Sequence, residues 1–223
     1  MYLIPIILLK KQRFTTVVWY HGGGLTAGDK ELPKSLLNQG ICVVGVRYRL
    51  CPTNELLNQN VTTEDVVDDA AAAAAWVMKN IERYGGDSTK KYLSGHSAGG
   101  YLVSMIGLDK SYLQKYNVDA DHFAALIPFS GQMITHFQNR RDRGMSDYQP
   151  LIDKHAPLFH IRKNCPPIIL ITGDRNMEML GRYEENAYMW RMLQLVGHPF
   201  AYLYELEGFD HGSMSRPAFF YFT

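Results

Sequence analysis

Cysteine is scarce in this 223-residue chain. The three cysteines, Cys42, Cys51 and Cys165, are odd in number and have no Cys-x-x-Cys spacing, which argues against a disulfide framework and against a zinc site. We expect all three to be small buried hydrophobes. The acidic pair Asp119 and Asp121 has no third ligand nearby. We therefore expect no metal.

An excess of charge is also missing. The formal net charge is +1, and the basic residues are spread along the chain except for Arg140, Arg141 and Arg143. A nucleic-acid surface needs a clustered basic patch, so we expect no nucleic-acid partner.

No apolar run is long enough to cross a membrane. The longest at the start, Met1 to Leu9, is far shorter than the roughly 20 residues that a bilayer requires. It contains Pro5, lacks a basic leading region and has no small-residue cleavage site, so it does not resemble a signal peptide. We interpret it as an edge strand. The expected location is cytoplasmic, or secreted or periplasmic if a leader has been removed from a longer parent.

The remaining composition is that of a globular protein, with 46% hydrophobic and 20% charged residues. This length suits one core, so residues 1–223 are predicted to form a single domain. Short apolar runs alternate with helical patterns, which predicts an α/β fold with a mostly parallel sheet and helices on both faces. The predicted strands cover 15–20, 41–48, 91–94, 124–129, 168–172 and 201–206.

Two helices stand out in the pattern. One begins after Thr62, which forms a capping-box-like start with Asp65, and six consecutive alanines at 70–75 would let it lie close to the sheet. The other is predicted over 178–196 and is stopped by Gly197 and Pro199.

Two glycine-rich motifs point to catalysis. Gly95-His96-Ser97-Ala98-Gly99 follows an apolar strand and precedes a small-residue, helix-compatible stretch, as in a nucleophile elbow. His21-Gly22-Gly23-Gly24 follows an earlier strand. Their order along the chain is the one expected if the first loop supplies backbone donors for an oxyanion and Ser97 is the nucleophile.

Together with Tyr84-Gly85-Gly86-Asp87 and a late Asp and His, these motifs resemble the α/β-hydrolases. The resemblance is to the esterase/lipase branch, near hormone-sensitive lipase, carbohydrate esterases and kynurenine formamidase, and it runs from Thr15 to Gly212. That family has further strands before the His-Gly-Gly-Gly strand, so the resemblance implies a sheet that is shortened at its N-terminal edge. Such an edge invites association, and a homo-oligomer is one expectation.

The chemistry of a serine nucleophile requires a base and an acid. We expect His211, in a loop after the last strand, to be the base, and the amides of Gly23, Gly24 and Ala98 to hold the oxyanion. Asp174 follows the strand at 168–172 and is the first choice for the acid. Glu178 stays open as an alternative, and the kynurenine-formamidase pattern implies an acid after the strand with Glu178 and Arg182 further on.

The segment between Gly131 and Cys165 breaks the alternating pattern. We expect the insert at 132–164 to act as a cap, with Phe137 and Arg140 binding substrate. The resemblance implies a serine hydrolase of carboxylic esters with small acyl groups, such as acetyl or feruloyl esters of carbohydrates, and no cofactor. The alternatives are an arylformamidase-like amide hydrolase and an inactive hydrolase fold that binds a partner.

Overall fold

The structure is a computed structural model that describes residues 13–52 and 60–222. Its centre is a six-stranded sheet in the order β2-β1-β3-β4-β5-β6, and every neighbouring pair is parallel. The strands are β1 (Phe14–Tyr20), β2 (Ile41–Val46), β3 (Gly86–His96), β4 (Ala125–Phe129), β5 (Ile168–Gly173) and β6 (Ala201–Leu206). All six predicted strands are present, whereas the predicted edge strand from Met1 to Leu9 lies outside the described residues.

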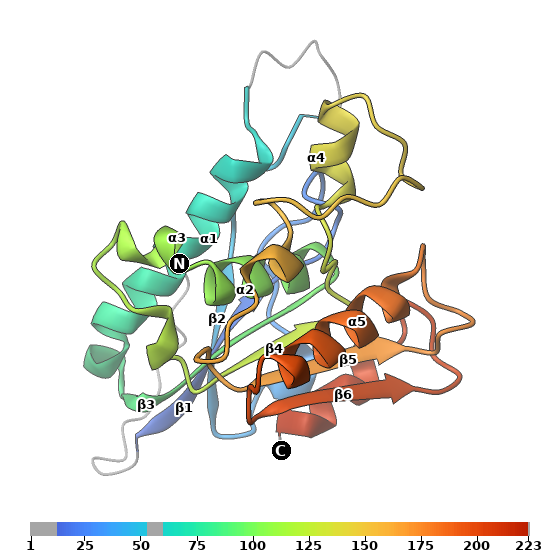
Figure 1. The fold of residues 1–223 in the computed structure, drawn as a ribbon. Coiled ribbons are helices and arrows are strands. Elements are labelled where there is room, and N and C mark those ends of the chain that lie inside the picture. Colours follow the sequence, from blue (N-terminus) through green and yellow to red (C-terminus); the bar gives the residue numbers. More distant parts are fainter. Residues whose placement is uncertain (1–12, 53–59, 223) are drawn as a thin grey trace.

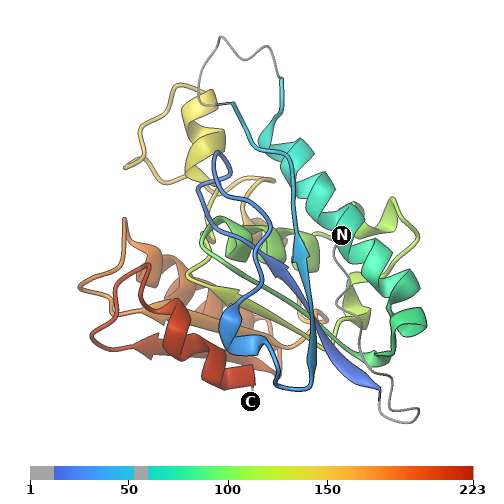
Figure 2. The ribbon, with the colours of Figure 1, turned by 180° about the vertical axis from the view of Figure 1, so that it is seen from behind.

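Helices cover both faces of this sheet because side chains of each strand point alternately to either side. Val18 and Tyr20 of β1 join one core, and Val17 and Trp19 join the other. On the first face lie α1 (Thr63–Asn80), α2 (Ala98–Leu108) and α5 (Arg182–Leu195), as Figure 1 shows. The second face is covered by η1 (Lys34–Leu36), α6 (Ser215–Ala218) and η6 (Phe219–Phe222), which are in front of the sheet in Figure 2.

The helix α1 begins as its sequence predicts. The Thr62 hydroxyl accepts a hydrogen bond from the Asp65 amide, and the Asp65 carboxylate accepts one from the Thr62 amide. Such a cap is worth about 1 kcal/mol. Its buried alanines bring the helix close enough to β1 for the Tyr20 hydroxyl to donate a hydrogen bond of 2.8 Å to the Ala70 carbonyl. The exact placement of this helix therefore depends on small side chains.

The helix α5 begins four residues later than predicted, at Arg182 instead of residue 178. Leu180 and Gly181 have positive φ angles of 45° and 70°, which a continuous right-handed helix does not allow. Residues 174–181 therefore form a separate loop between β5 and α5. This loop has a central part in the site described below.

Shorter elements complete the fold. They are η3 (Ile81–Tyr84), α3 (Lys110–Gln114), η4 (Ala120–His122), α4 (Phe137–Asp142) and η5 (Pro157–His160). The last two belong to the insert after β4, and α4 lies beyond the carboxyl ends of the strands in Figure 1. All three cysteines are free; Cys51 and Cys165 are buried and Cys42 is half-buried. No helix in the described part of the chain is both long and apolar enough to span a bilayer.

Candidate active site

The nucleophile elbow links β3 to α2. Ser97 has φ 56° and ψ −113°, a backbone conformation that non-glycine residues rarely adopt. A Cβ atom at Gly95 or Gly99 would lie 2.6 Å or 2.0 Å from the Tyr20 carbonyl oxygen, so only glycine fits on either side of the serine. The Ser97 amide donates a hydrogen bond of 2.8 Å to the Phe129 carbonyl, which fixes the turn against β4.

His211 lies directly beside this serine. Its Nε2 is 2.9 Å from Ser97 Oγ, and it comes from the loop after β6. The backbone of that loop is held by His96, whose Nε2 is 2.7 Å from the His211 carbonyl oxygen and donates to it. Burial, together with the neighbouring His211, lowers the pKa of His96 to about 4, so its ring stays neutral near pH 7. The two rings are 4.9 Å apart between centroids.

The carboxylate that contacts His211 belongs to Glu178. Its Oε2 is 2.8 Å from His211 Nδ1, and only 1% of its side chain is exposed. Its Oε1 accepts hydrogen bonds from the Ser130 hydroxyl and from the Gly173 amide. Burial alone would raise the pKa of Glu178, but these donors together lower it to about 2. Glu178 is therefore ionised at neutral pH although it is buried.

Asp174, the first choice from the sequence, is not the partner of His211. Its carboxylate accepts hydrogen bonds of 2.9 Å from the amides of Asn176 and Gly208, and these lower its pKa. Its backbone carbonyl accepts the Glu178 amide at 2.8 Å. Asp174 thus shapes the loop that presents Glu178. The sequence favoured Asp174 because it directly follows β5. In the structure the chain makes one helical turn after Asp174, and this turn brings Glu178 beside Ser130 and His211.

Two further residues support this arrangement. Ser130 was not expected from the sequence, whereas Arg182 belongs to the kynurenine-formamidase pattern. Ser130 follows β4 directly, is fully buried and has a positive φ of 43°. Arg182, at the start of α5, is also buried and donates to the Ser130 carbonyl. The only signal for Ser130 was a polar residue at the carboxyl end of a buried strand, the edge at which active-site groups of such sheets gather.

The His21–Gly24 loop after β1 closes the other side of the site. A Cβ atom at Gly22 would lie 3.4 Å from Ser97 Cβ, so this loop lies directly against Ser97. His21 stacks on Tyr48 with ring centroids 4.1 Å apart, and the Tyr48 hydroxyl donates to the His21 carbonyl at 2.6 Å. Within the described residues, no group accepts a hydrogen bond from the amides of Gly23, Gly24 or Ala98.

The insert brings one of its two predicted binding residues to this loop. Phe137, the first residue of α4, lies so close that a Cβ atom at Gly24 would be 3.0 Å from its ring. The Arg141 guanidinium carbon is 4.6 Å from the centre of the same ring.

The prediction for Arg140 was wrong, because its guanidinium points into the insert itself. Only 2% of it is exposed, and its guanidinium donates to the backbone carbonyls of Thr135, Asp147 and Gln149. A buried guanidinium must find acceptors for its N–H groups, and here the insert's own backbone supplies them. Arg140 therefore stabilises the fold of the insert, and its guanidinium is bound by backbone carbonyls of the insert.

A family model for BD-FAE matches residues 6–180, more than three quarters of the chain. The chain belongs to the BD-FAE family.

Curated relatives of this BD-FAE chain include two proteins of Mycobacterium tuberculosis. The "probable carboxylic ester hydrolase LipM" is 26% identical over 205 residues, which cover 81% of this chain and 45% of that protein. "Esterase LipC" is 25% identical over 212 residues, which cover 87% of this chain and 50% of that protein. The chain thus spans about half the length of these relatives.

Solved structures show the same fold. The apo form of Thermogutta terrifontis esterase 2 superposes with a TM-score of 0.73 at 23% identity, covering 93% of this chain and 77% of that one. The BD-FAE chain therefore has the α/β-hydrolase fold that its motifs predict.

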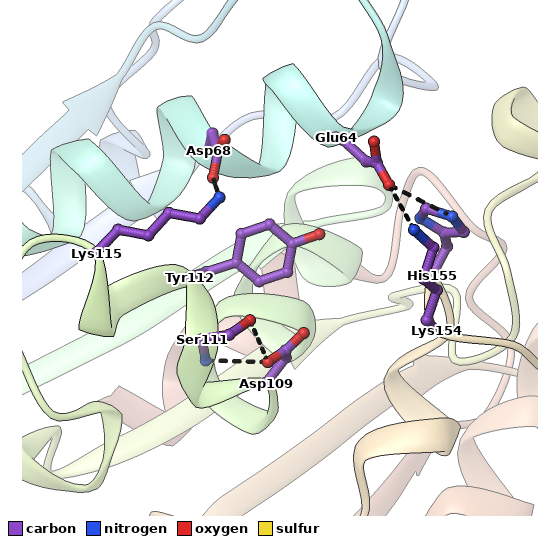
Figure 3. A pocket seen from close by; sticks show the side chains of 8 residues that line it. All are labelled: Glu64, Asp68, Asp109, Ser111, Tyr112, Lys115, Lys154 and His155. Carbon is purple, nitrogen blue, oxygen red and sulfur yellow. Dashed lines mark hydrogen bonds and ion pairs between the residues drawn. The ribbon is translucent and has the colours of Figure 1, made fainter.

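A hollow elsewhere in this BD-FAE protein does not include Ser97, His211 or Glu178. It measures about 330 Å³ and lies between α1, α3 and the segment at 154–155 (Figure 3). Its charged side chains pair with one another: Lys115 with Asp68, and Lys154 with Glu64. Among residues 13–52 and 60–222, no cluster of three or more His, Cys, Asp or Glu side chains is arranged to hold a metal ion.

Proposed function

We propose that this protein is a serine esterase that hydrolyses carboxylic esters, with Ser97, His211 and Glu178 as its catalytic triad. The observation that carries the proposal is the continuous hydrogen-bonded line from Ser97 Oγ through both ring nitrogens of His211 to a buried carboxylate, with links of 2.9 and 2.8 Å. The activities named for the relatives point in the same direction.

The proposed reaction begins when Ser97 Oγ attacks the ester carbonyl and His211 Nε2 takes the hydroxyl proton. Glu178 keeps the proton of the neutral ring on Nδ1 and stabilises the imidazolium that forms. The imidazolium then gives its proton to the departing alkoxide, which leaves an acyl group on Ser97. Water, deprotonated by the same ring, releases the carboxylic acid and restores the serine.

The oxyanion of each tetrahedral intermediate needs donors that are already in place. The amides of Gly23, Gly24 and Ala98 have no acceptor among the described residues, and the loop that carries the two glycines lies directly against Ser97. Ala98 is also the first residue of α2, where the helix dipole favours negative charge. These three amides are the proposed oxyanion hole.

The proposed substrates are esters of small acyl groups, among them acetyl or feruloyl esters of carbohydrates. Support for a ring-bearing group comes from Phe137, which lies at the glycine loop with Arg141 against its face. An aromatic surface suits the flat face of a sugar or a phenolic ring. In this proposal the insert at 132–164 caps the site and contributes Phe137 to the pocket.

The rival functions receive less support. The amide-hydrolase alternative rested on Asp174 as the acid, and that carboxylate contacts loop amides instead of His211. An inactive binding fold would have no need of a strained serine beside a correctly placed imidazole.

A substrate panel tests the proposal. Wild-type protein is expected to hydrolyse nitrophenyl acetate and methyl ferulate far faster than N-formylkynurenine, with a burst of nitrophenol equal to the enzyme concentration when deacylation is slow. Faster turnover of N-formylkynurenine would move the assignment to amide hydrolysis. If the folded protein turned over none of these three compounds, the result would favour the inactive fold that binds a partner.

A further inference from the structure

Three polar side chains of α5 are buried, although a helix face that packs on a core is usually apolar. Arg182, Glu185 and Asn186 are spaced as i, i+3 and i+4, so they share one face of the helix, and none is more than 9% exposed. Arg182 donates a hydrogen bond to the Ser130 carbonyl. Asn186 donates one of 2.9 Å to the Gly131 carbonyl. This face of α5 therefore holds the chain where it leaves β4 and enters the insert.

Glu185 holds the next two residues of the insert. Its Oε2 accepts the Met133 amide at 2.9 Å, and its Oε1 accepts a hydrogen bond of 3.5 Å from Gln132 Nε2. Burial raises the pKa of Glu185, and the nearby Arg182 and these N–H donors oppose the increase. Because the carboxylate accepts from Gln132, it fixes the orientation of that side-chain amide, with Nε2 toward Glu185 and Oε1 directed elsewhere.

The oxygen of Gln132 reaches α4. Gln132 is 2% exposed, and its Oε1 accepts the Phe137 amide at 3.0 Å. Phe137 is the first residue of α4, and the first amides of a helix have no acceptor within that helix. The ring of Phe137 lies against the glycine loop, only 3.0 Å from a Cβ atom placed at Gly24. Gln132 thus links α5 to the end of α4 that lies at the proposed oxyanion loop.

We propose that Gln132, oriented by Glu185, is a positioning residue that holds Phe137 at the glycine loop and thereby sets the preference for acyl groups that carry a ring. This role rests on the proposed function, in which Phe137 lines the pocket. Gln132 acts through Phe137 and not on the reacting atoms. Loss of the link is therefore expected to weaken binding of ring-bearing esters and to leave the chemistry at Ser97 unchanged.

Gln132→Leu tests the proposal, because it removes both hydrogen bonds and has a similar volume. The KM for methyl ferulate should rise by about two- to tenfold, the range of one aromatic contact, while kcat for nitrophenyl acetate stays close to wild type. Gln138→Leu is the matched control: Gln138 belongs to α4 and is 8% exposed, but its side chain donates to Asp142 at 2.8 Å. Equal shifts of the acetyl-to-feruloyl ratio in both variants would overturn the proposal.

A double variant shows whether Gln132 acts through Phe137. Gln132→Leu combined with Phe137→Ala should have the selectivity of Phe137→Ala alone, because the effects of residues linked by a direct contact are not additive. Additive changes in the selectivity ratio would show that Gln132 does not act through the Phe137 ring, and the proposal would fail.

An exchange of the two side chains tests the part of Glu185. Gln132→Glu alone places two carboxylates against each other and should shift the selectivity. Addition of Glu185→Gln restores one amide and one carboxylate, which can together accept the Met133 and Phe137 amides, so the ratio should return to within about twofold of wild type. A folded double variant with no such recovery would remove Glu185 from the proposal.

Hydrogen exchange of the Phe137 amide gives a readout that does not depend on turnover. The amide should exchange about fivefold faster in Gln132→Leu than in wild type, as for loss of one neutral hydrogen bond, and near the wild-type rate in Gln138→Leu. If this difference appeared but wild type hydrolysed no ester, the proposed function would fail and the link between Gln132 and α4 would stand. An unchanged exchange rate in Gln132→Leu would overturn the link whatever the activity.

Discussion

The loop after β5 carries two carboxylates in opposite surroundings. Asp174 is at the open end, where its oxygens accept hydrogen bonds from two backbone amides. Glu178, one helical turn later, has a side chain that is 1% exposed and accepts hydrogen bonds from His211, Ser130 and Gly173. The first carboxylate builds a turn, and the second orients an imidazole.

The difference teaches how a buried negative charge is maintained. Removal of a carboxylate from water raises its pKa, unless several donors point at both of its oxygens. Glu178 has such donors from three different strand ends, because Gly173 ends β5, Ser130 follows β4 and His211 follows β6. The described donors to Asp174 come from its own turn and from the adjacent loop.

The largest effect is expected for Ser97→Ala, because Glu178 and His211 can act in catalysis only if Ser97 is the nucleophile. Loss of the Oγ atom should reduce turnover of nitrophenyl acetate by about 10⁶, as in other serine triads, while the far-UV spectrum and melting temperature stay close to wild type. Retention of a tenth of the wild-type rate would remove Ser97 from the proposed mechanism.

The comparison itself is tested by replacing each carboxylate with its amide. Glu178→Gln should cost about 10⁴ in turnover at neutral pH, because the amide no longer fixes the ring tautomer or stabilises the imidazolium. Asp174→Asn keeps an acceptor for the loop amides and should lower turnover by less than about tenfold. The reverse ranking in steady-state kinetics would return the acid role to Asp174.

Ser130→Ala sharpens the comparison by removing one donor from Glu178. We expect about a tenfold lower kcat with little change in KM, since a hydrogen bond to a charged group is worth about 1.5–3 kcal/mol. Ser94→Ala is the matched control: Ser94 is equally buried, but its hydroxyl donates to the Ile127 carbonyl. Equal losses in kcat for both variants would show that Ser130 is only a packing residue.

The smallest effect is expected in the insert. Phe137→Ala should change the ratio of acetyl-ester to feruloyl-ester turnover by about two- to tenfold, the range of one aromatic contact, with little effect on melting temperature. Phe159→Ala is the control, because Phe159 belongs to the same insert and is 60% exposed. An unchanged ratio in the Phe137 variant would exclude that ring from the pocket.

Features with local causes were predictable from the sequence. The elbow glycines are required by contact with a single carbonyl of the neighbouring strand, and Thr62 with Asp65 caps α1 within four residues. The alternation of short apolar runs with helical patterns also predicted all six parallel strands, because most of these strands are covered on both faces and rich in Val, Ile and Leu.

Features with long-range causes were not predictable. Whether Asp174 or Glu178 meets His211 depends on the positive φ angles at Leu180 and Gly181, which end the turn before α5 begins. The direction of Arg140 depends on backbone carbonyls up to nine residues later in an irregular segment. Neither the positive φ angles nor the contacts of Arg140 produce a periodic pattern in the sequence.

The most direct test of the triad is the rate at which a fluorophosphonate probe labels the protein, followed by intact-protein mass spectrometry and peptide mapping. The account predicts one adduct per chain on Ser97, formed at a similar rate in Asp174→Asn and far more slowly in Glu178→Gln. Labelling at another residue, or an equal rate in wild type and Glu178→Gln, would contradict it.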